Sequence, residues 1–373
     1  MDFVDCAQYE PRNTGNKSGD FEVRYIGFKV VQNMKKALIA ILTVVFLISC
    51  VESKETKLQR FLLKGNLMAE DNNEIQAITY YEEALKIDPC FVDALNNIGT
   101  IYFRQKRFDV ALENYEKAIS CKPGYLNAYF NRANTYYELK EYFRAIKDID
   151  RVIGAKPDTA IAYFTRGLVF TKLRDFPAAL EAFDKSVQLD SNKVEYFVNR
   201  ATVKFYLKDF EAAKADLFKA KELDASEAII YNTESLVEVE LKNYAKAMVL
   251  INKAISLAPD APYFVNNRGF IYLSLGELEK AEADINKGIG LDPYNGWAYR
   301  NKGIYYLLKN DFESAERLLK QAVDMDRFID KIHFYLGMAY LKNGKQGPAC
   351  EHFDISEELG DKMLTTDLIK RCK

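Results

Sequence analysis

The sequence predicts an all-α solenoid of about nine helical pairs, on three observations. Pro89, Pro123 and Pro157 are 34 residues apart, and Pro259 and Pro293 continue the same register. A fixed period of this length is typical of stacked repeats. Small side chains recur at two fixed positions of the period, as helices that cross closely require. Only nine prolines and 18 glycines occur among 373 residues, which favours helices over a turn-rich β fold.

The composition limits the functions that fit. The 49% of apolar residues allow a sizeable core, and 52 basic against 54 acidic residues give no bulk attraction for nucleic acid or an anionic membrane surface. The two histidines, His333 and His352, offer little for catalysis or metal binding. We find no phosphate-binding glycine loop and no CxxC, HExxH or GxSxG pattern. We therefore expect no enzyme, no metal site, no cofactor and no small-molecule substrate, and we interpret His333 as a core residue.

The most hydrophobic stretch lies near the amino terminus. Lys35 and Lys36 precede twelve uncharged residues, 37–48, which is the pattern of a secretory signal and too short for an ordinary membrane span. The stretch closes on Leu47-Ile48-Ser49-Cys50. A buried helix or a plain membrane anchor is the alternative interpretation.

This closing tetrapeptide resembles the lipobox of bacterial lipoproteins. The resemblance implies cleavage before Cys50, lipidation of its thiol, and a mature chain that sits on a membrane without crossing it. Residues 34–49 would be the signal peptide and 50–57 a lipidated tether. We expect Met34 to be the true start and 1–33 an upstream extension, either untranslated or unstructured. Val51 stands where an Asp would favour the inner membrane of Gram-negative bacteria, so the resemblance implies the outer membrane of the cell envelope.

The 34-residue period fills the rest of the chain. With the proline counted as position 32, nine repeats run from residue 58 to residue 363. Position 8 is always Gly, Ala or Ser, and position 20 is always Ala. Large apolar residues recur at position 11 and aromatic ones at position 17, and we expect them to fill the space that the small residues leave. Residues 364–373, with Leu364, Leu368 and Ile369 at helical spacing, predict a capping helix.

This pattern resembles the tetratricopeptide repeat. The resemblance implies that each repeat is helix A, a turn, helix B and a loop, and that the pairs form a right-handed superhelix lined inside by the A helices. Position 7 departs from the family, because it is basic in several repeats. Three of those repeats also carry Asp at position 23, so we expect an ion pair between helices A and B in each of them. The pairs are Arg132 with Asp148, Arg200 with Asp216, and Arg268 with Asp284.

Position 6 of helix A is the candidate binding position. It is asparagine in five repeats, although asparagine is mildly unfavourable in a helix. Local hydrogen bonding is the alternative use. In similar superhelices an asparagine ladder binds extended peptide along the inner groove, and family geometry points further positions inward. The predicted groove residues are Asn97, Asn131, Asn134, Asn199, Asn266, Asn267, Trp297, Arg300 and Asn301. Docking on the outer B-helix face is the weaker alternative.

The remaining cysteines would lie in an oxidising compartment after export, where disulfides persist. A helical hairpin turning at Gly360 and Asp361 would set Cys350 opposite Cys372, and we predict that bridge. Cys90 and Cys121 flank the turn of the second repeat symmetrically, but the sequence leaves their separation open. Free buried thiols are the alternative for both pairs.

The function predicted is a membrane-anchored binding scaffold for other envelope proteins or peptides. The repeats occupy nearly all of the predicted mature chain, which leaves no room for a catalytic domain. The alternative is a non-catalytic subunit or adaptor of an enzyme that processes cell wall or glycans.

Overall fold

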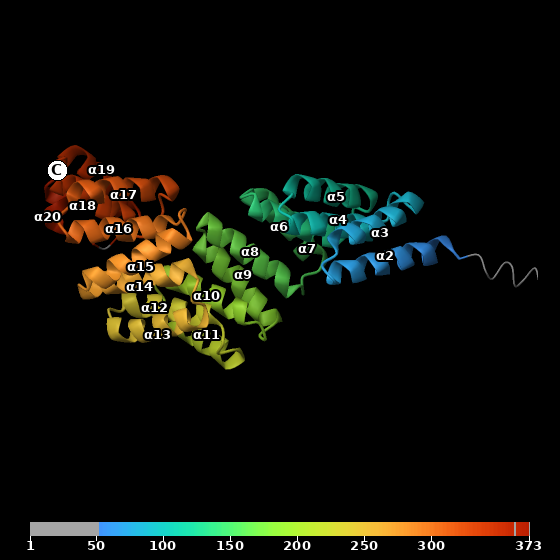
Figure 1. Cartoon of the computed structure of the whole chain (residues 1–373), viewed down its shortest axis with the longest axis horizontal. Coiled ribbons are helices and arrows are strands. Elements are labelled where there is room, and N and C mark those ends of the chain that lie inside the picture. The colour runs from blue at the N-terminus through green and yellow to red at the C-terminus, as the bar shows by residue number, and fades with distance from the viewer. Residues whose placement is uncertain (1–51, 362, 373) are drawn as a thin grey trace, which may run out of the picture. The chain divides into compact units, whose positions relative to one another are not determined.

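The computed structural model describes residues 52–361 and 363–372, and these residues form 19 helices and no strand (Figure 1). The chain divides into two compact units, 1–124 and 125–373, which we describe separately. In unit 1 the helices are α2 (Lys54–Glu70), α3 (Glu74–Ile87), α4 (Val92–Arg104) and α5 (Phe108–Cys121). The predicted signal and Cys50 lie outside the described residues. Within the described part, no helix is long and apolar enough to span a membrane.

Unit 2 contains the remaining helices. They are α6 (Leu126–Glu138), α7 (Tyr142–Ala155), α8 (Ala160–Leu173), α9 (Phe176–Leu189), α10 (Val194–Tyr206), α11 (Phe210–Leu223), α12 (Ala228–Glu240), α13 (Tyr244–Leu257), α14 (Pro262–Leu275), α15 (Leu278–Leu291), α16 (Gly296–Leu308), α17 (Phe312–Met325), α18 (Ile332–Lys342), α19 (Gln346–Glu358) and α20 (Thr366–Lys370). Even-numbered helices from α2 to α18 are A helices, and the odd-numbered ones are B helices. Each A helix packs against the B helix that follows it. The predicted solenoid of helical pairs is confirmed.

The turn between helices A and B has a left-handed residue at position 15 in all nine repeats. The φ angle there is positive, for example 59° at Lys106 and 64° at Lys208, and glycine occupies the position only twice. In the second repeat Lys106 N–H donates to Phe103 O and Arg107 N–H to Tyr102 O, both at 2.9 Å, which is a Schellman motif. The sequence does not reveal this position, because lysine is an unusual choice for left-handed backbone.

The side chain at position 24 of helix B fills the space where helices A and B cross. A Cβ atom added to Gly167 would lie 2.6 Å from Cε1 of Phe183, which is fully buried. The six repeats with glycine at position 8 carry Tyr, Phe, Ile or Leu at position 24, whereas those with Ala133, Ala201 or Ser235 carry Ile or Leu. Position 24 therefore fills the space opposite position 8, a role that we had expected of positions 11 and 17.

The three predicted ion pairs between helices A and B are confirmed. Arg132 donates to Asp148 from Nε at 2.7 Å and from Nη2 at 2.8 Å, and the other two pairs are bidentate in the same way. Arg200 and Arg268 also donate from Nη1 to Asp184 and Asn252 of the preceding repeats, so all three arginines bond to side chains of the protein itself.

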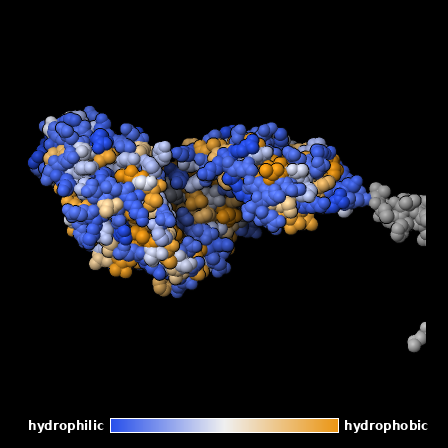
Figure 2. Space-filling model, viewed as in Figure 1, coloured by the Kyte–Doolittle hydropathy of each residue, from blue (hydrophilic) through white to orange (hydrophobic). Residues whose placement is uncertain are grey.

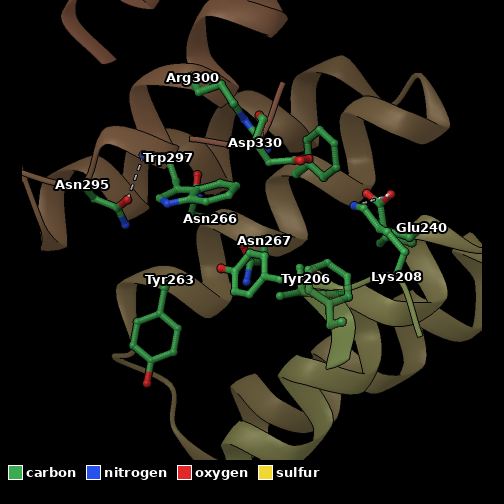
Figure 3. Close-up of a pocket in the computed structure, with 14 residues that line it drawn as sticks. Tyr206, Lys208, Glu240, Tyr263, Asn266, Asn267, Asn295, Trp297, Arg300 and Asp330 are labelled. Atoms are coloured by element: carbon green, nitrogen blue, oxygen red, sulfur yellow. Dashed lines mark hydrogen bonds and ion pairs between the residues drawn. The ribbon is translucent and has the colours of Figure 1, made fainter. Parts of the chain in front are cut away.

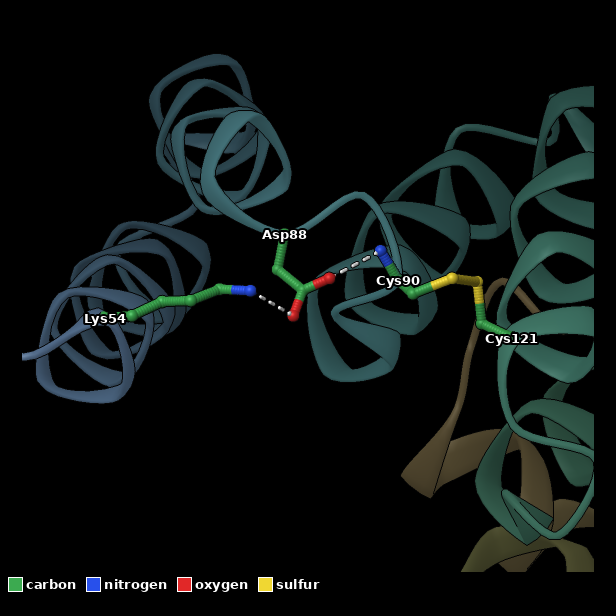
Figure 4. The surroundings of a disulfide bond; sticks show 4 residues. All are labelled: Lys54, Asp88, Cys90 and Cys121. Atoms are coloured by element: carbon green, nitrogen blue, oxygen red, sulfur yellow. Dashed lines mark hydrogen bonds and ion pairs between the residues drawn. A yellow bond between two sulfur atoms is a disulfide. The ribbon is translucent and has the colours of Figure 1, made fainter.

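Two disulfides join cysteines in the described residues. Cys90 and Cys121 have Cα atoms 5.4 Å apart, and beside them Asp88 accepts from Cys90 N–H and pairs with Lys54 (Figure 4). In unit 2, Cys350 and Cys372 have Cα atoms 5.3 Å apart. This second bridge ties the segment that carries α20 to α19.

The carboxyl-terminal segment covers the end of the last repeat. Leu364, Leu368 and Cys372 pack against its core. His333 is buried there, bonded to Arg327 O and stacked on His352. Burial lowers the pKa of His352 to about 4, and the charge of His333 adds to the shift. Among the described residues no cluster of His, Cys, Asp or Glu could hold a metal ion.

Candidate functional site

A pocket of about 190 Å³ lies among the A helices of unit 2 (Figure 3). Helices α12, α14 and α16 contribute residues at the spacing of three to four that places side chains on one face, and α10 contributes Phe205 and Tyr206 at its end. Asp330, which precedes α18, completes the wall. The lining residues are Phe205, Tyr206, Lys208, Leu236, Val239, Glu240, Tyr263, Asn266, Asn267, Phe270, Asn295, Trp297, Arg300 and Asp330.

Aromatic side chains make up much of this wall. Figure 3 shows Trp297 and Tyr263 on one side of the pocket and Tyr206 on the other. Asn295 caps α16 by accepting from Trp297 N–H at 3.1 Å, which fixes the start of the helix that carries the indole. Burial raises the pKa of Tyr206. The pocket therefore offers apolar surface with polar groups at its edge.

Arg300 is the buried cation of the site. Its guanidinium lies between two rings, with Cζ 4.8 Å from the centroid of Phe270 and 4.7 Å from that of Trp297. It donates to Asn301 Oδ1 from Nε and Nη2, and to Asp330 O from Nη1 at 3.0 Å. Burial lowers the pKa of Arg300. The side chain is thus held rigidly, and it holds the rings beside it.

The asparagine amides join successive A helices. Asn267 Nδ2 donates to Asn232 Oδ1 at 2.8 Å, and Asn301 Nδ2 donates to Asn266 Oδ1 at 3.0 Å. In both cases position 6 of one repeat meets position 5 of the repeat before it. Asn301 is only 1% exposed. Asn301 therefore packs beneath the residues that line the pocket. We had expected it to contact a ligand, but its burial prevents this.

The other predicted groove residues lie away from the pocket. Asn97 donates to Asn66 at 3.0 Å and lines a separate hollow in unit 1. Asn199 donates to Glu195 O, four residues earlier in α10. This is the local hydrogen bonding that the sequence left open as an alternative to ligand binding. Asn131 and Asn134 are half-buried on α6. Of the predicted set, the pocket brings together Asn266, Asn267, Trp297 and Arg300.

Several lining residues were missed from the sequence. Tyr206 and Glu240 occupy position 13, the last residue of their A helices, and Lys208 is the left-handed turn residue. Their shared place at the end of helix A was the available signal. Asp330 carried no such signal, because it lies in the non-helical segment before α18.

Family models settle what kind of repeat this is. Models described as TPR repeat or tetratricopeptide repeat match residues 59–89, 99–140, 130–193, 228–261, 264–295 and 300–358, which is more than half of the chain. The chain belongs to the tetratricopeptide repeat family. The resemblance inferred from the 34-residue period is confirmed for these residues.

Two solved structures share this fold. A chain of the APC/C hetero-tetramer Cut9–Hcn1 is 18% identical, with a TM-score of 0.55, over 81% of this chain and 59% of its own length. PilF of Pseudomonas aeruginosa is also 18% identical, with a TM-score of 0.51, over 56% of this chain and 95% of its own. At such identities the likeness shows the fold alone. No curated protein matches this chain by sequence.

Proposed function

We propose that this tetratricopeptide repeat protein is a scaffold that binds segments of other proteins in the pocket of unit 2. The observation that supports the proposal is the aromatic pocket on the A helices. Trp, Tyr and Arg are the residues that most often dominate the energy of protein interfaces. Trp297, Tyr263 and Arg300 all line this pocket.

The size of the pocket favours one or two side chains of a partner. Small-molecule sites usually measure about 300 to 1,000 Å³, whereas this pocket measures about 190 Å³. The partner would therefore be anchored by a side chain, and the surrounding amide and charged groups would contact its backbone.

Affinity purification with a paired set of variants tests this proposal. Tyr263→Ala with Asn267→Ala removes pocket contacts on α14 while keeping good helix formers. Retention of co-purifying proteins from detergent-solubilised envelopes should fall at least tenfold, measured by quantitative mass spectrometry.

The matched control is Phe143→Ala with Phe218→Ala. These rings lie on the B helices α7 and α11 and are 78% and 59% exposed. The control should retain the partners. Loss of partners from the control, with full retention by the pocket variant, would place the site on the outer face.

We also propose that the scaffold is a bacterial lipoprotein anchored through Cys50, in the outer membrane. The lipobox-like sequence before Cys50 supports this, and so do the two disulfides, because disulfides are rare in reducing compartments. Cys50→Ala should abolish palmitate labelling and release the protein into the soluble fraction. Labelling that persists in this variant would refute the anchor while leaving the pocket proposal intact.

A further inference from the structure

The segment that enters the ninth repeat departs from the pattern of the others. Seven A helices begin at position 1 of their repeats, whereas α18 begins at Ile332, position 3, after a left-handed Lys331 with φ 58°. Residues 326–331 thus form a non-helical connection between α17 and α18. We name this segment the clasp.

The clasp contacts helices that are distant in sequence. Lys331 Nζ lies 2.8 Å from Glu240 Oε1, at the end of α12 and 91 residues earlier. The guanidinium of Arg174, which caps α8, lies over the ring of Phe328 at 5.4 Å. Repeats of a solenoid normally contact only their neighbours. The clasp, which links the eighth and ninth repeats, therefore contacts the fourth repeat through Phe328 and the sixth through Lys331.

The clasp also forms part of the pocket wall. Asp330 lines the pocket, and its carbonyl oxygen accepts from Arg300. Glu240, the ion-pair partner of Lys331, lines the same pocket. Its Oε2 atom lies 3.6 Å from Nζ of Lys208. Figure 3 shows Asp330 between Arg300 and the Glu240–Lys208 pair. The groups that hold the clasp are therefore also groups of the binding site.

The two sides of the clasp are held with unequal strength. On the side of the last repeats, Ile329 is 1% exposed in their core, and Arg327 O is bonded to His333. On the far side the contacts are an ion pair and a cation–ring contact, which are weak when partly exposed. Phe328 is 42% exposed. Opening would therefore separate the clasp from α8 and α12 and leave it seated on the last repeats.

We propose that the clasp is an autoinhibitory closure of the pocket, and that a partner enters after the clasp releases α8 and α12. In the closed state the clasp blocks one end of the pocket. An extended chain then cannot run through this part of the groove, in contrast to the arrangement expected from the sequence. What the clasp regulates rests on the proposed function, but its opening can be measured on the protein alone.

Trp297 is a built-in reporter for the test, because it is the only tryptophan of the chain and it lines the pocket. Lys331→Met and Glu240→Gln each remove one side of the ion pair. Each should raise the acrylamide quenching constant of Trp297 at least twofold, and the double variant should exceed either single variant only slightly, because one contact is lost in all three. Lys342→Met, an exposed lysine at the end of α18, is the matched control and should leave quenching unchanged.

A distance measurement separates opening from unfolding. Spin labels at exposed positions 172 on α8 and 342 on α18 should give a longer mean distance in the Lys331→Met variant, with unchanged helical circular dichroism. Unchanged quenching and unchanged distance in both single variants would overturn the clasp. Opening without increased partner capture would overturn its autoinhibitory role. Loss of partners in the variant that carries Tyr263→Ala and Asn267→Ala tests the proposed function and not the clasp.

Discussion

Replacing Arg132 with methionine should lower the free energy of unfolding by about 3 to 5 kcal/mol, because it leaves a buried carboxylate without its counter-ion. The side chain of Asp148 is only 6% exposed, and Arg132 is its bidentate partner. Methionine keeps much of the apolar stem of arginine, so the loss should come mainly from the charge. Urea unfolding followed by circular dichroism measures it.

The chain provides a control at the same position of the next repeat. Arg166 pairs with Asp150, whose side chain is 50% exposed, so Arg166→Met should cost about 0 to 1 kcal/mol. Replacing both members of the buried pair, as Arg132→Met with Asp148→Leu, should recover most of the lost stability. Equal losses at the two arginines would contradict the dependence on burial.

Replacing Gly167 with alanine should destabilise the fourth repeat by up to about 2.5 kcal/mol. Overpacking a core costs about 1 to 3 kcal/mol, and alanine returns about 0.5 to 1 kcal/mol as the better helix former. The new Cβ would lie 2.6 Å from the ring of Phe183, a residue that is only 1% exposed. The measurement is again urea unfolding.

The third repeat shows how the clash can be relieved. There Ala133 stands at position 8 and Ile149 at position 24. Phe183→Ile should therefore restore most of the stability lost by Gly167→Ala. Gly154→Ala, at an exposed position of α7, is the control, because no neighbouring atom lies within 4 Å of its added Cβ, and it should stabilise slightly. A loss at Gly154 as large as that at Gly167 would argue against the packing explanation.

The repeat itself was predictable because its signals are local and occur nine times. The small residues at positions 8 and 20 and the joint occurrence of Arg132 with Asp148 report contacts within one helical pair. The role of each asparagine on the A helices was harder to predict. An asparagine on helix A can face the groove or the next helix, and the sequence does not distinguish Asn267, at the pocket, from Asn301, buried behind it. The clasp could not be predicted from the sequence, because its contacts join repeats that are not neighbours in the chain. Those contacts depend on the curvature of the whole stack.

The contact between Glu240 and Lys331 also dictates an order of folding. Closing a flexible loop of 91 residues costs about 4 kcal/mol in chain entropy beyond a constant, more than a partly exposed ion pair returns. The intervening repeats need only neighbour contacts, so they can form first and bring the two ends together without that cost. During synthesis, repeats four to eight are complete before the whole ninth repeat exists. We therefore expect the clasp to close only after repeats four to eight have folded, so the open arrangement precedes the closed one during folding.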